Sequence, residues 1–294
     1  MNPSVSVIIP TYNWSSVLPY SIGSVLRQTF TDFEVLVVGD GCTDDSEAVV
    51  RRISDPRIKW INLPINTGHQ SEPNNEGLRQ ARGQFIAYLG HDDLWLPHHL
   101  SCLVSALKQG ADLAYGATLS LVAGPDGYHG YHRHFWPYYE SYQPGIPILP
   151  TSVVHRRSVT DHVGGWHHYR DIEPWQRAYS ANYRFVFVPR LTAIKFPAGA
   201  RRHVYKIRPC HEQAAWSERI QNEDGFEAAE LIRTVLPMVM EYEPKPYLVL
   251  LRYFVQRTRK GLARRVRRFI SRPARPKGDS IDAVREFKGL PRMP

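Results

Sequence analysis

The sequence predicts an α/β fold in which helices flank a mostly parallel sheet. Two short apolar runs rich in β-branched residues, 5–9 (VSVII) and 33–38 (FEVLVV), have the composition of buried parallel strands. Between them, residues 17–28 place apolar side chains at helical spacing. A strand, a helix and a second strand in this order form a crossover unit, and such units build parallel sheets. We therefore expect a ligand to bind where the strands end.

The remaining elements follow from the same patterns. In the first half of the chain we expect helices at 46–53 and 72–82, strands at 58–62 and 85–89, and a helix that starts near Leu96. In the second half we expect a strand from Ser152, a turn at 164–166, a helix at 174–180, a strand at 183–188 and helical structure from about 223 to 268. Residues 128–142, of which 10 of 15 are aromatic or histidine, predict a loop or an edge structure.

The positive charge of the chain is concentrated near its C-terminus. The net charge is +9, and residues 252–277 hold 11 Lys and Arg and no Asp or Glu. Apolar side chains recur in this stretch at the spacing of one helical face. We therefore expect a globular domain at 1–222 and a basic helical extension at 223–294. The extension can lie on an anionic membrane surface, or its apolar face can pack on the protein's own core.

Several classes of protein are excluded by what the sequence lacks. No apolar run reaches the length of about 18 residues that a membrane-spanning helix needs. The first strand is not followed by a Gly-x-Gly-x-x-Gly or a Gly-x-x-x-x-Gly-Lys loop, which argues against a dinucleotide cradle and a P-loop. The basic charge comes with no nucleic-acid-binding pattern, so we expect no nucleic-acid partner. Three cysteines without C-x-x-C spacing, and no signal-peptide pattern, predict a cytoplasmic protein.

Acidic residues at predicted strand ends are the first candidates for chemistry. Asp92 and Asp93 directly follow a predicted strand, and two adjacent carboxylates suit a hard cation such as Mg²⁺ or Mn²⁺. The alternative is that Asp93 caps the helix expected near Leu96. Asp40 ends another strand, where its carboxylate can accept hydrogen bonds from a base or a ribose, or can serve as a turn residue.

Aromatic side chains in the middle part of the chain suggest a surface for a sugar acceptor. Trp136 and Trp166 are the candidates, because the faces of aromatic rings suit the apolar faces of sugars. Ordinary packing in the core is the competing explanation for both.

Five segments, taken in order, carry a resemblance to a known family: VSVIIPTYN (5–13), SVLRQTFTDFEVLVVGDGCTDDS (24–46), NTG (66–68), GQFIAYLGHDD (83–93) and RDIEPWQRA (170–178). Together they resemble the family 2 glycosyltransferases, which are inverting enzymes with the GT-A fold. The resemblance spans roughly residues 4–208. It implies that the domain at 1–222 transfers a sugar from a nucleoside-diphosphate donor to an acceptor hydroxyl, with Mg²⁺ or Mn²⁺ as cofactor.

The resemblance implies a donor site in three loops. Pro10, Thr11 and Tyr12 match the first nucleotide-contacting loop. Asp40 matches the aspartate that recognises the base, which is usually uracil, so a UDP-sugar is favoured. Asp92 matches the acidic residue that binds the ribose.

The resemblance also implies a metal site and a general base. Asp93 matches the residue that holds the metal on the diphosphate, and His203 lies where some relatives have a histidine that closes over it. Asp171 matches the general base that takes the proton of the acceptor hydroxyl. Arg170 stands beside it, where the family usually has a glutamate, and Asn74 replaces the family's arginine at the donor site.

The leading hypothesis is thus an inverting glycosyltransferase that acts on a glycan or a lipid-linked acceptor in surface polysaccharide or glycolipid synthesis. We expect it in the cytoplasm, peripherally at the inner face of the membrane. Two alternatives stay open: a nucleotidyltransferase on a related fold, which would release pyrophosphate, and a catalytically silent protein that binds nucleotide-sugars.

Overall fold

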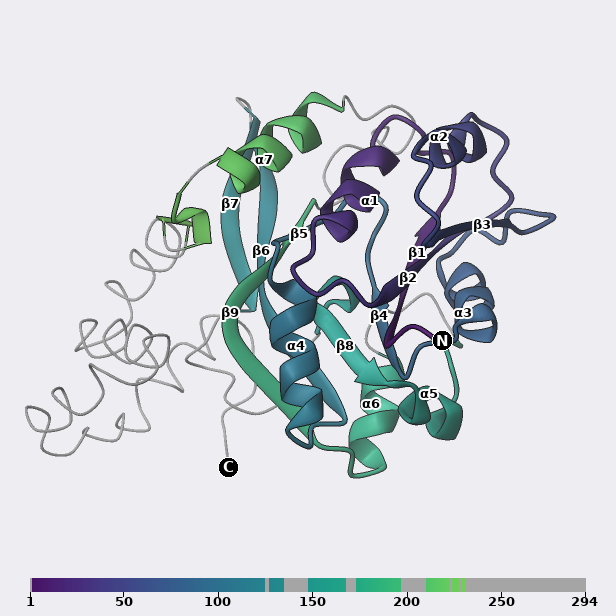
Figure 1. The fold of residues 1–294 in the computed structure, drawn as a ribbon, viewed down its shortest axis with the longest axis vertical. Coiled ribbons are helices and arrows are strands. Elements are labelled where there is room, and N and C mark those ends of the chain that lie inside the picture. The colour runs from purple at the N-terminus through teal and green to yellow at the C-terminus, as the bar shows by residue number, and fades with distance from the viewer. Residues whose placement is uncertain are drawn as a thin grey trace, which may run out of the picture. The chain divides into compact units, whose positions relative to one another are not determined.

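One nine-stranded sheet organises the part of the chain that the computed structural model describes, namely residues 2–124, 127–134, 148–167, 173–196, 210–222, 224–227 and 229–230 (Figure 1). The chain divides into two compact units, Met1–Phe226 and Glu227–Pro294, and the sheet belongs to the first. The strands are β1 (Val5–Thr11), β2 (Phe33–Gly39), β3 (Ile58–Asn62), β4 (Phe85–Tyr88), β5 (Leu94–Trp95), β6 (Leu113–Gly124), β7 (Gly127–His134), β8 (Val153–Arg156) and β9 (Phe185–Lys195).

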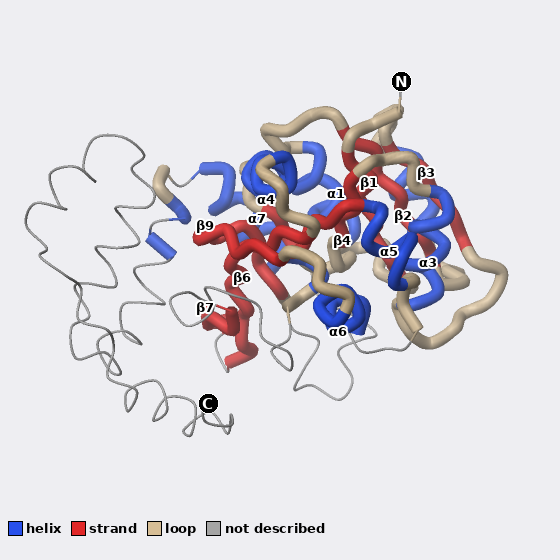
Figure 2. The backbone as a smooth tube through the Cα atoms, turned by 90° about the horizontal axis from the view of Figure 1, so that it is seen from below, coloured by secondary structure: helices blue, strands red, loops and turns tan. Residues whose placement is uncertain are grey.

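Helices cover both faces of this sheet (Figure 2). They are α1 (Leu18–Leu26), α2 (Ser46–Arg52), α3 (Ser71–Gln80), α4 (His99–Lys108), α5 (Arg157–Val163), α6 (Glu173–Ser180) and α7 (His211–Asn222), with a short 3₁₀ helix at Pro150–Ser152. Because successive strand residues point to opposite faces, Ile9 packs with α1 and α4 while Ile8 packs against α3. The core therefore has two layers, one on each side of the sheet.

The first half of the sheet is parallel. Its order is β3-β2-β1-β4, and the register joins Val5 to Phe33 on one side and to Phe85 on the other. Strands that run the same way end at the same edge, so the loops that follow β1, β2 and β4 lie together. This confirms the predicted α/β class and the strand-helix alternation through residue 88.

The second half of the sheet is mixed. β8 runs antiparallel between β4 and β6, and β9 runs parallel to β6 along its other edge. Residues 118–120 of β6 pair with both β7 and β9, so β7 continues along the edge that β8 begins. β5 is antiparallel to β9 and completes the order.

Some local predictions differ from the structure, and some elements were not predicted. The helix expected near Leu96 begins only at His99, because Leu94–Trp95 first forms β5 against β9. The strand expected at 183–188 is the longer β9. α7 was not predicted at all. Within 128–142, residues up to 134 form the edge strand β7, and 135–142 lie outside the described residues, as does almost all of the helical stretch expected at 223–268.

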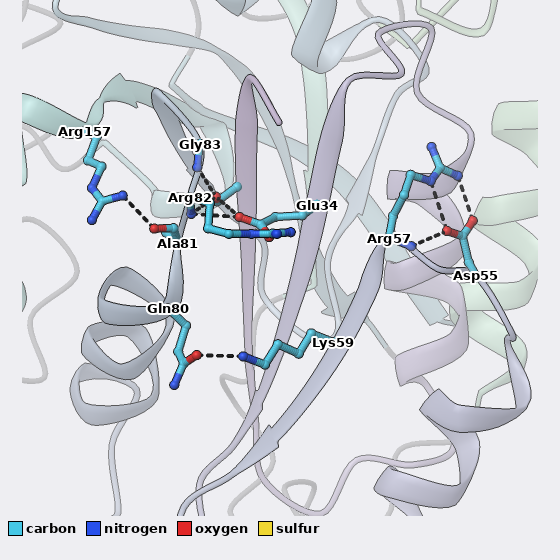
Figure 3. A network of polar contacts seen from close by, with 10 residues as sticks. Glu34, Asp55, Arg57, Lys59, Gln80, Ala81, Arg82, Gly83 and Arg157 are labelled. Atoms are coloured by element: carbon cyan, nitrogen blue, oxygen red, sulfur yellow. Dashed lines mark hydrogen bonds and ion pairs between the residues drawn. The ribbon is translucent and has the colours of Figure 1, made fainter. Parts of the chain in front are cut away.

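A polar network ties the amino-terminal edge of the sheet, opposite the loops just described (Figure 3). The Glu34 carboxylate accepts hydrogen bonds from Ser6 Oγ at 2.7 Å and from the Arg82 backbone N–H at 2.8 Å. The Arg82 guanidinium adds two further bonds, at 2.9 and 2.6 Å. This charge-assisted set joins β1 and β2 to the connection between α3 and β4.

No helix in the described ranges is long and apolar enough to cross a membrane.

Candidate functional site

The loops after β1 and β2 are tied to each other by hydrogen bonds. The Asp40 backbone N–H donates to the Thr11 carbonyl at 2.8 Å, extending the pairing by one residue beyond the strand ends. Asn13, with a positive φ of 54°, accepts a bond from the Thr43 N–H on its side-chain oxygen at 2.8 Å. The two loops therefore lie side by side at the carboxyl edge of the sheet.

Asp40 holds the turn at residues 66–68. Its carboxylate accepts the Thr67 hydroxyl at 2.7 Å, the Thr67 N–H at 3.1 Å, the Asn66 side-chain amide at 2.9 Å and the Gly68 N–H at 3.2 Å. The side chain is buried, and these bonds account for both of its carboxylate oxygens. Asp40 thus lies at the predicted strand end, and in the described structure it organises the NTG turn of the sequence.

A glycine is required next to Asp40. Gly41 has φ of +68°, and a Cβ there would lie 2.4 Å from the Asn66 backbone nitrogen. Both the backbone conformation and the close approach of the 65–66 segment exclude a side chain. The loop after β2 and the turn at 66–68 are consequently packed against each other.

The acidic loop follows β4 and contains Asp92 and Asp93. The Asp93 carboxylate is almost fully buried and accepts the Phe196 N–H at 3.0 Å, while the Lys195 ammonium lies 3.4 Å from its other oxygen. Asp93 does not cap α4, because that helix begins at His99 and has no side-chain cap. A Cβ at Gly90 would lie 2.8 Å from the Asp93 carboxylate, so a side chain at this position would displace that carboxylate.

The donor set of the acidic loop fits a divalent cation. Burial raises the pKa of the Asp93 carboxyl above its ordinary value against the opposing charge of Lys195, and the negative charge of Asp92 adds to the rise. A hard cation would lower the electrostatic cost of keeping the Asp92 and Asp93 carboxylates both charged. Within the described ranges no three His, Cys, Asp or Glu side chains come together to bind a metal, and Asp92 and Asp93 are the pair of carboxylates that could contact one.

The first loop and the acidic loop meet through an aromatic pair that sequence reasoning missed. The rings of Trp14 and His91 stack with centroids 4.7 Å apart and planes 19° apart. Pro10 and Thr11 are buried at the end of β1, where the Thr11 hydroxyl has no hydrogen-bond partner among the described residues, and Tyr12 is exposed. No local pattern marks the Trp14–His91 contact, because the two residues are far apart in the sequence.

Trp166 is a core residue rather than an exposed platform for a sugar. Its ring is 2% exposed and packs edge-on against Tyr88 and Trp175, with centroids 5.2 and 5.7 Å away. Trp166 is therefore too buried to stack on a sugar, and the competing explanation, packing in the core, accounts for it. Three other predicted site residues lie outside the described residues: Trp136, Asp171 and His203.

Two curated bacterial proteins illustrate the sequence relationships. A GalNAc(5)-diNAcBac-PP-undecaprenol beta-1,3-glucosyltransferase of Campylobacter jejuni is 36% identical over 122 residues, covering 40% of this chain and 38% of that protein. The UDP-Glc:alpha-D-GlcNAc-diphosphoundecaprenol beta-1,3-glucosyltransferase WfgD of Escherichia coli is 37% identical over 113 residues, covering 38% and 44%. The matched region thus spans less than half the length of these relatives.

Solved structures share the fold at low sequence identity. S. aureus TarS 1–349 in complex with UDP-GlcNAc superposes with a TM-score of 0.57 and 21% identity, covering 78% of this chain and 69% of that one. The mannosyltransferase PcManGT from Pyrobaculum calidifontis, in complex with GDP-Man and Mn²⁺, gives 0.54 and 17%, covering 90% and 83%. The sequence model of the family described as Glycosyl transferase family 2 matches residues 6–206. Since that match covers well over half of the sequence, the chain belongs to glycosyl transferase family 2.

Proposed function

We propose that this protein is an inverting glycosyltransferase that transfers a sugar from a nucleoside-diphosphate donor to an acceptor hydroxyl. The observation that carries the proposal is the carboxyl edge of the parallel strands, where the loop of buried Asp40 and the loop of Asp92 and Asp93 both contact the loop after β1. The first contact is made by hydrogen bonds and the second by the Trp14–His91 stack. A parallel sheet presents its ligands at this edge. The family membership supports the same assignment.

The reaction needs one base and one means of stabilising the leaving group. Asp171 takes the proton of the acceptor hydroxyl as its oxygen attacks the anomeric carbon from the face opposite the diphosphate, which inverts the configuration there. A divalent cation, when bound at Asp92 and Asp93, supplies charge stabilisation to the departing diphosphate. The Phe196 N–H and Lys195 hold the Asp93 carboxylate in place.

We assign the donor as a nucleotide-sugar, with a UDP-sugar favoured. One relative is named for the use of UDP-Glc, and solved neighbours are described with UDP-GlcNAc and with GDP-Man. In this chain Asp40 already accepts bonds from the turn at 66–68, so base recognition by its carboxylate requires one of those bonds to be exchanged. Asp92 remains our candidate for the ribose as well as the metal.

We assign the acceptor as a glycan or a lipid-linked sugar in surface polysaccharide or glycolipid synthesis. Both named relatives carry an undecaprenol-linked acceptor in their names. The basic stretch at 252–277 supports action at an anionic membrane surface, on its cytoplasmic side.

The test is a panel of nucleotide-sugars incubated with the purified full chain and Mn²⁺, with release of nucleoside diphosphate and formation of a glycosylated acceptor as the readouts. We expect release with one donor. Asp171→Asn should lower the rate by roughly 10²- to 10⁴-fold, the usual contribution of a general base, and leave donor binding unchanged. Asp161→Asn, an exposed carboxylate on α5, is the matched control and should change neither quantity.

Other outcomes point to the alternatives. Release of pyrophosphate identifies a nucleotidyltransferase, and donor binding without any release identifies a silent binding protein. If Asp171→Asn abolishes donor binding instead of turnover, Asp171 is not the base.

A further inference from the structure

The turn that leads from α5 towards α6 is held by the side chain of Asn75 on α3. The Asn75 side-chain amide donates to the Trp166 carbonyl at 2.7 Å, and its oxygen accepts the Trp166 N–H at 2.8 Å. The side chain thus pairs with the Trp166 backbone at two points, as a neighbouring strand would. The Trp166 ring is anchored in the core at the same time.

The turn is shaped to let Asn75 approach. A Cβ on Gly165 would lie 2.3 Å from the Asn75 side-chain oxygen, and Gly164 has φ of +83°. A side chain at position 165 would therefore push Asn75 away, and position 164 adopts a conformation that favours glycine. The GGW segment of the sequence is accounted for by this one contact.

α6 also binds this turn, through the side chain of Arg177. The Arg177 guanidinium donates to three consecutive carbonyls, those of Val163 at 2.8 Å, Gly164 at 3.3 Å and Gly165. Trp175, also on α6, is fully buried against Trp166. The turn is therefore fixed to α6 as well as to α3.

α3 in turn is fixed to the donor side of the sheet. A Cβ on Gly77 would lie 2.5 Å from Ile8 on β1, so the helix backbone packs directly on that strand. α3 begins at Ser71, three residues after the turn that Asp40 holds. A continuous set of described contacts thus runs from the carboxylate of Asp40 through α3 and Asn75 to Trp166 and α6.

We infer that Asn75 is a positioning residue for sugar transfer, which holds Trp166 and, through it, α6 against α3 and the donor strands. This inference rests on the proposed function, because the segment between Trp166 and α6 carries Asp171 between two anchored ends, Trp166 and the start of α6. Asn75 touches neither reactant in this role; it holds the described elements that flank Asp171 in the sequence. A misplacement of about 1 Å between reacting groups can cost on the order of 100-fold in rate.

The test compares two amide side chains on the same helix. Asn75→Ala should lower kcat by roughly 10- to 100-fold while the KM for the donor stays within about twofold. Gln80→Ala is the matched control: Gln80 lies on α3 and links it to Lys59 on β3 but does not reach the turn, so both constants should keep their values. A loss of donor affinity equal to the loss of kcat, or an unchanged kcat, overturns the inference.

The pair of Asn75–Trp166 hydrogen bonds is called the clamp below, and a second variant distinguishes its loss from a general loss of stability. Gly165→Ala should reproduce the kcat loss, because its methyl group displaces the Asn75 oxygen. The double variant Asn75→Ala/Gly165→Ala should be no slower than Asn75→Ala alone, since both changes break one contact. Effects that multiply instead would show two independent defects and reject the clamp.

The proposed function and the clamp can fail separately. If the wild-type chain turns over no donor in the panel, the proposed function fails, and hydrogen exchange at the Trp166 amide still tests the contact. That amide should exchange faster in Asn75→Ala than in wild type and at the wild-type rate in Gln80→Ala. Equal rates in all three proteins would overturn the clamp itself.

Discussion

The Asp40 carboxylate accepts hydrogen bonds from the protein's own turn at residues 66–68. Its two oxygens accept bonds from Asn66, Thr67 and Gly68, all from a turn that the chain reaches more than twenty residues later. The family resemblance implies that Asp40, at the end of a β-strand, recognises the base of the donor. The contacts add a second role, which is to fix the turn from which α3 begins.

Asp40→Asn should therefore weaken both the turn and donor binding. The carboxamide presents an N–H₂ group where the turn offers N–H donors, so at least one bond to a charged acceptor is lost, at a cost of about 1.5–3 kcal/mol. Urea denaturation should show this loss, and calorimetry should show weaker binding of a nucleoside diphosphate. Asp45→Asn, in the same loop, has no side-chain cap bond and serves as the control. Equal stability of the two variants would contradict the role of Asp40 in the turn.

The positions of several site residues could be predicted from the sequence, but their partners could not. Asp92, Asp93 and Asp40 stand after apolar runs, and this local pattern is enough to place them at strand ends. The partners of Asp93 are the last residue of β9 and the residue after it, about one hundred residues away, and no periodicity in the sequence indicates such a contact. Trp166 shows the same limit, because a tryptophan after two glycines can face solvent or core with the same local sequence.

At the level of elements, β8 is the strand that joins the two halves of the sheet. It lies antiparallel between β4 and β6, and its His155 is completely buried. The His155 ring stacks near Tyr88, with centroids 5.7 Å apart, and one ring nitrogen is 2.7 Å from the Arg156 carbonyl. Burial lowers the pKa of His155 to about 4.

The stability of the fold should therefore fall as the pH drops from about 6.5 to about 4. In this window the unfolded chain binds a proton at His155 that the folded chain does not, so the free energy of unfolding decreases with falling pH, by up to about 3 kcal/mol for this residue. Urea titrations at several pH values measure the slope. His155→Phe should flatten it, while His162→Phe, an exposed histidine on α5, should not; equal slopes for the two variants would contradict the assignment.

Strands and helices were predicted correctly where the local sequence pattern determines them, and missed where they depend on pairing with a distant part of the chain. β1 and β2 are fully buried apolar runs and were found close to their observed bounds. β5 is only Leu94–Trp95, and it exists because β9 pairs with it, so the apolar run around it resembled the start of a helix instead. The short β5 also displaced the start of α4 to His99.

At the level of the whole molecule, charge separates one stretch from the rest. Residues 252–277 hold 11 of the 37 Lys and Arg, and the remaining 26 are slightly outnumbered by the 28 Asp and Glu, all of which lie elsewhere. A chain that is nearly neutral apart from one basic stretch would meet an anionic surface through that stretch. The prediction for this stretch comes from its sequence alone.

Replacing Arg264, Arg265, Arg267 and Arg268 by Glu should reduce binding to vesicles that contain anionic lipid by at least about 100-fold, because each basic residue contributes about 1 kcal/mol near such a surface. Sedimentation with vesicles measures the effect, and vesicles of neutral lipid are the control. Turnover with a water-soluble acceptor should stay at the wild-type rate. Unchanged partitioning onto anionic vesicles would exclude this stretch as a membrane contact.

The order of strands in the sheet has a consequence for biosynthesis. β8 follows β6 in the chain but lies between β4 and β6 in the sheet, so the outer edge of β4 has no partner strand until residues 153–156 have left the ribosome. Until then a nascent chain whose first four parallel strands have assembled presents open backbone donors and acceptors to its neighbours on a polysome. Pairing of β8 thus covers the open edge of β4, and chaperones that limit association through this edge would act before it.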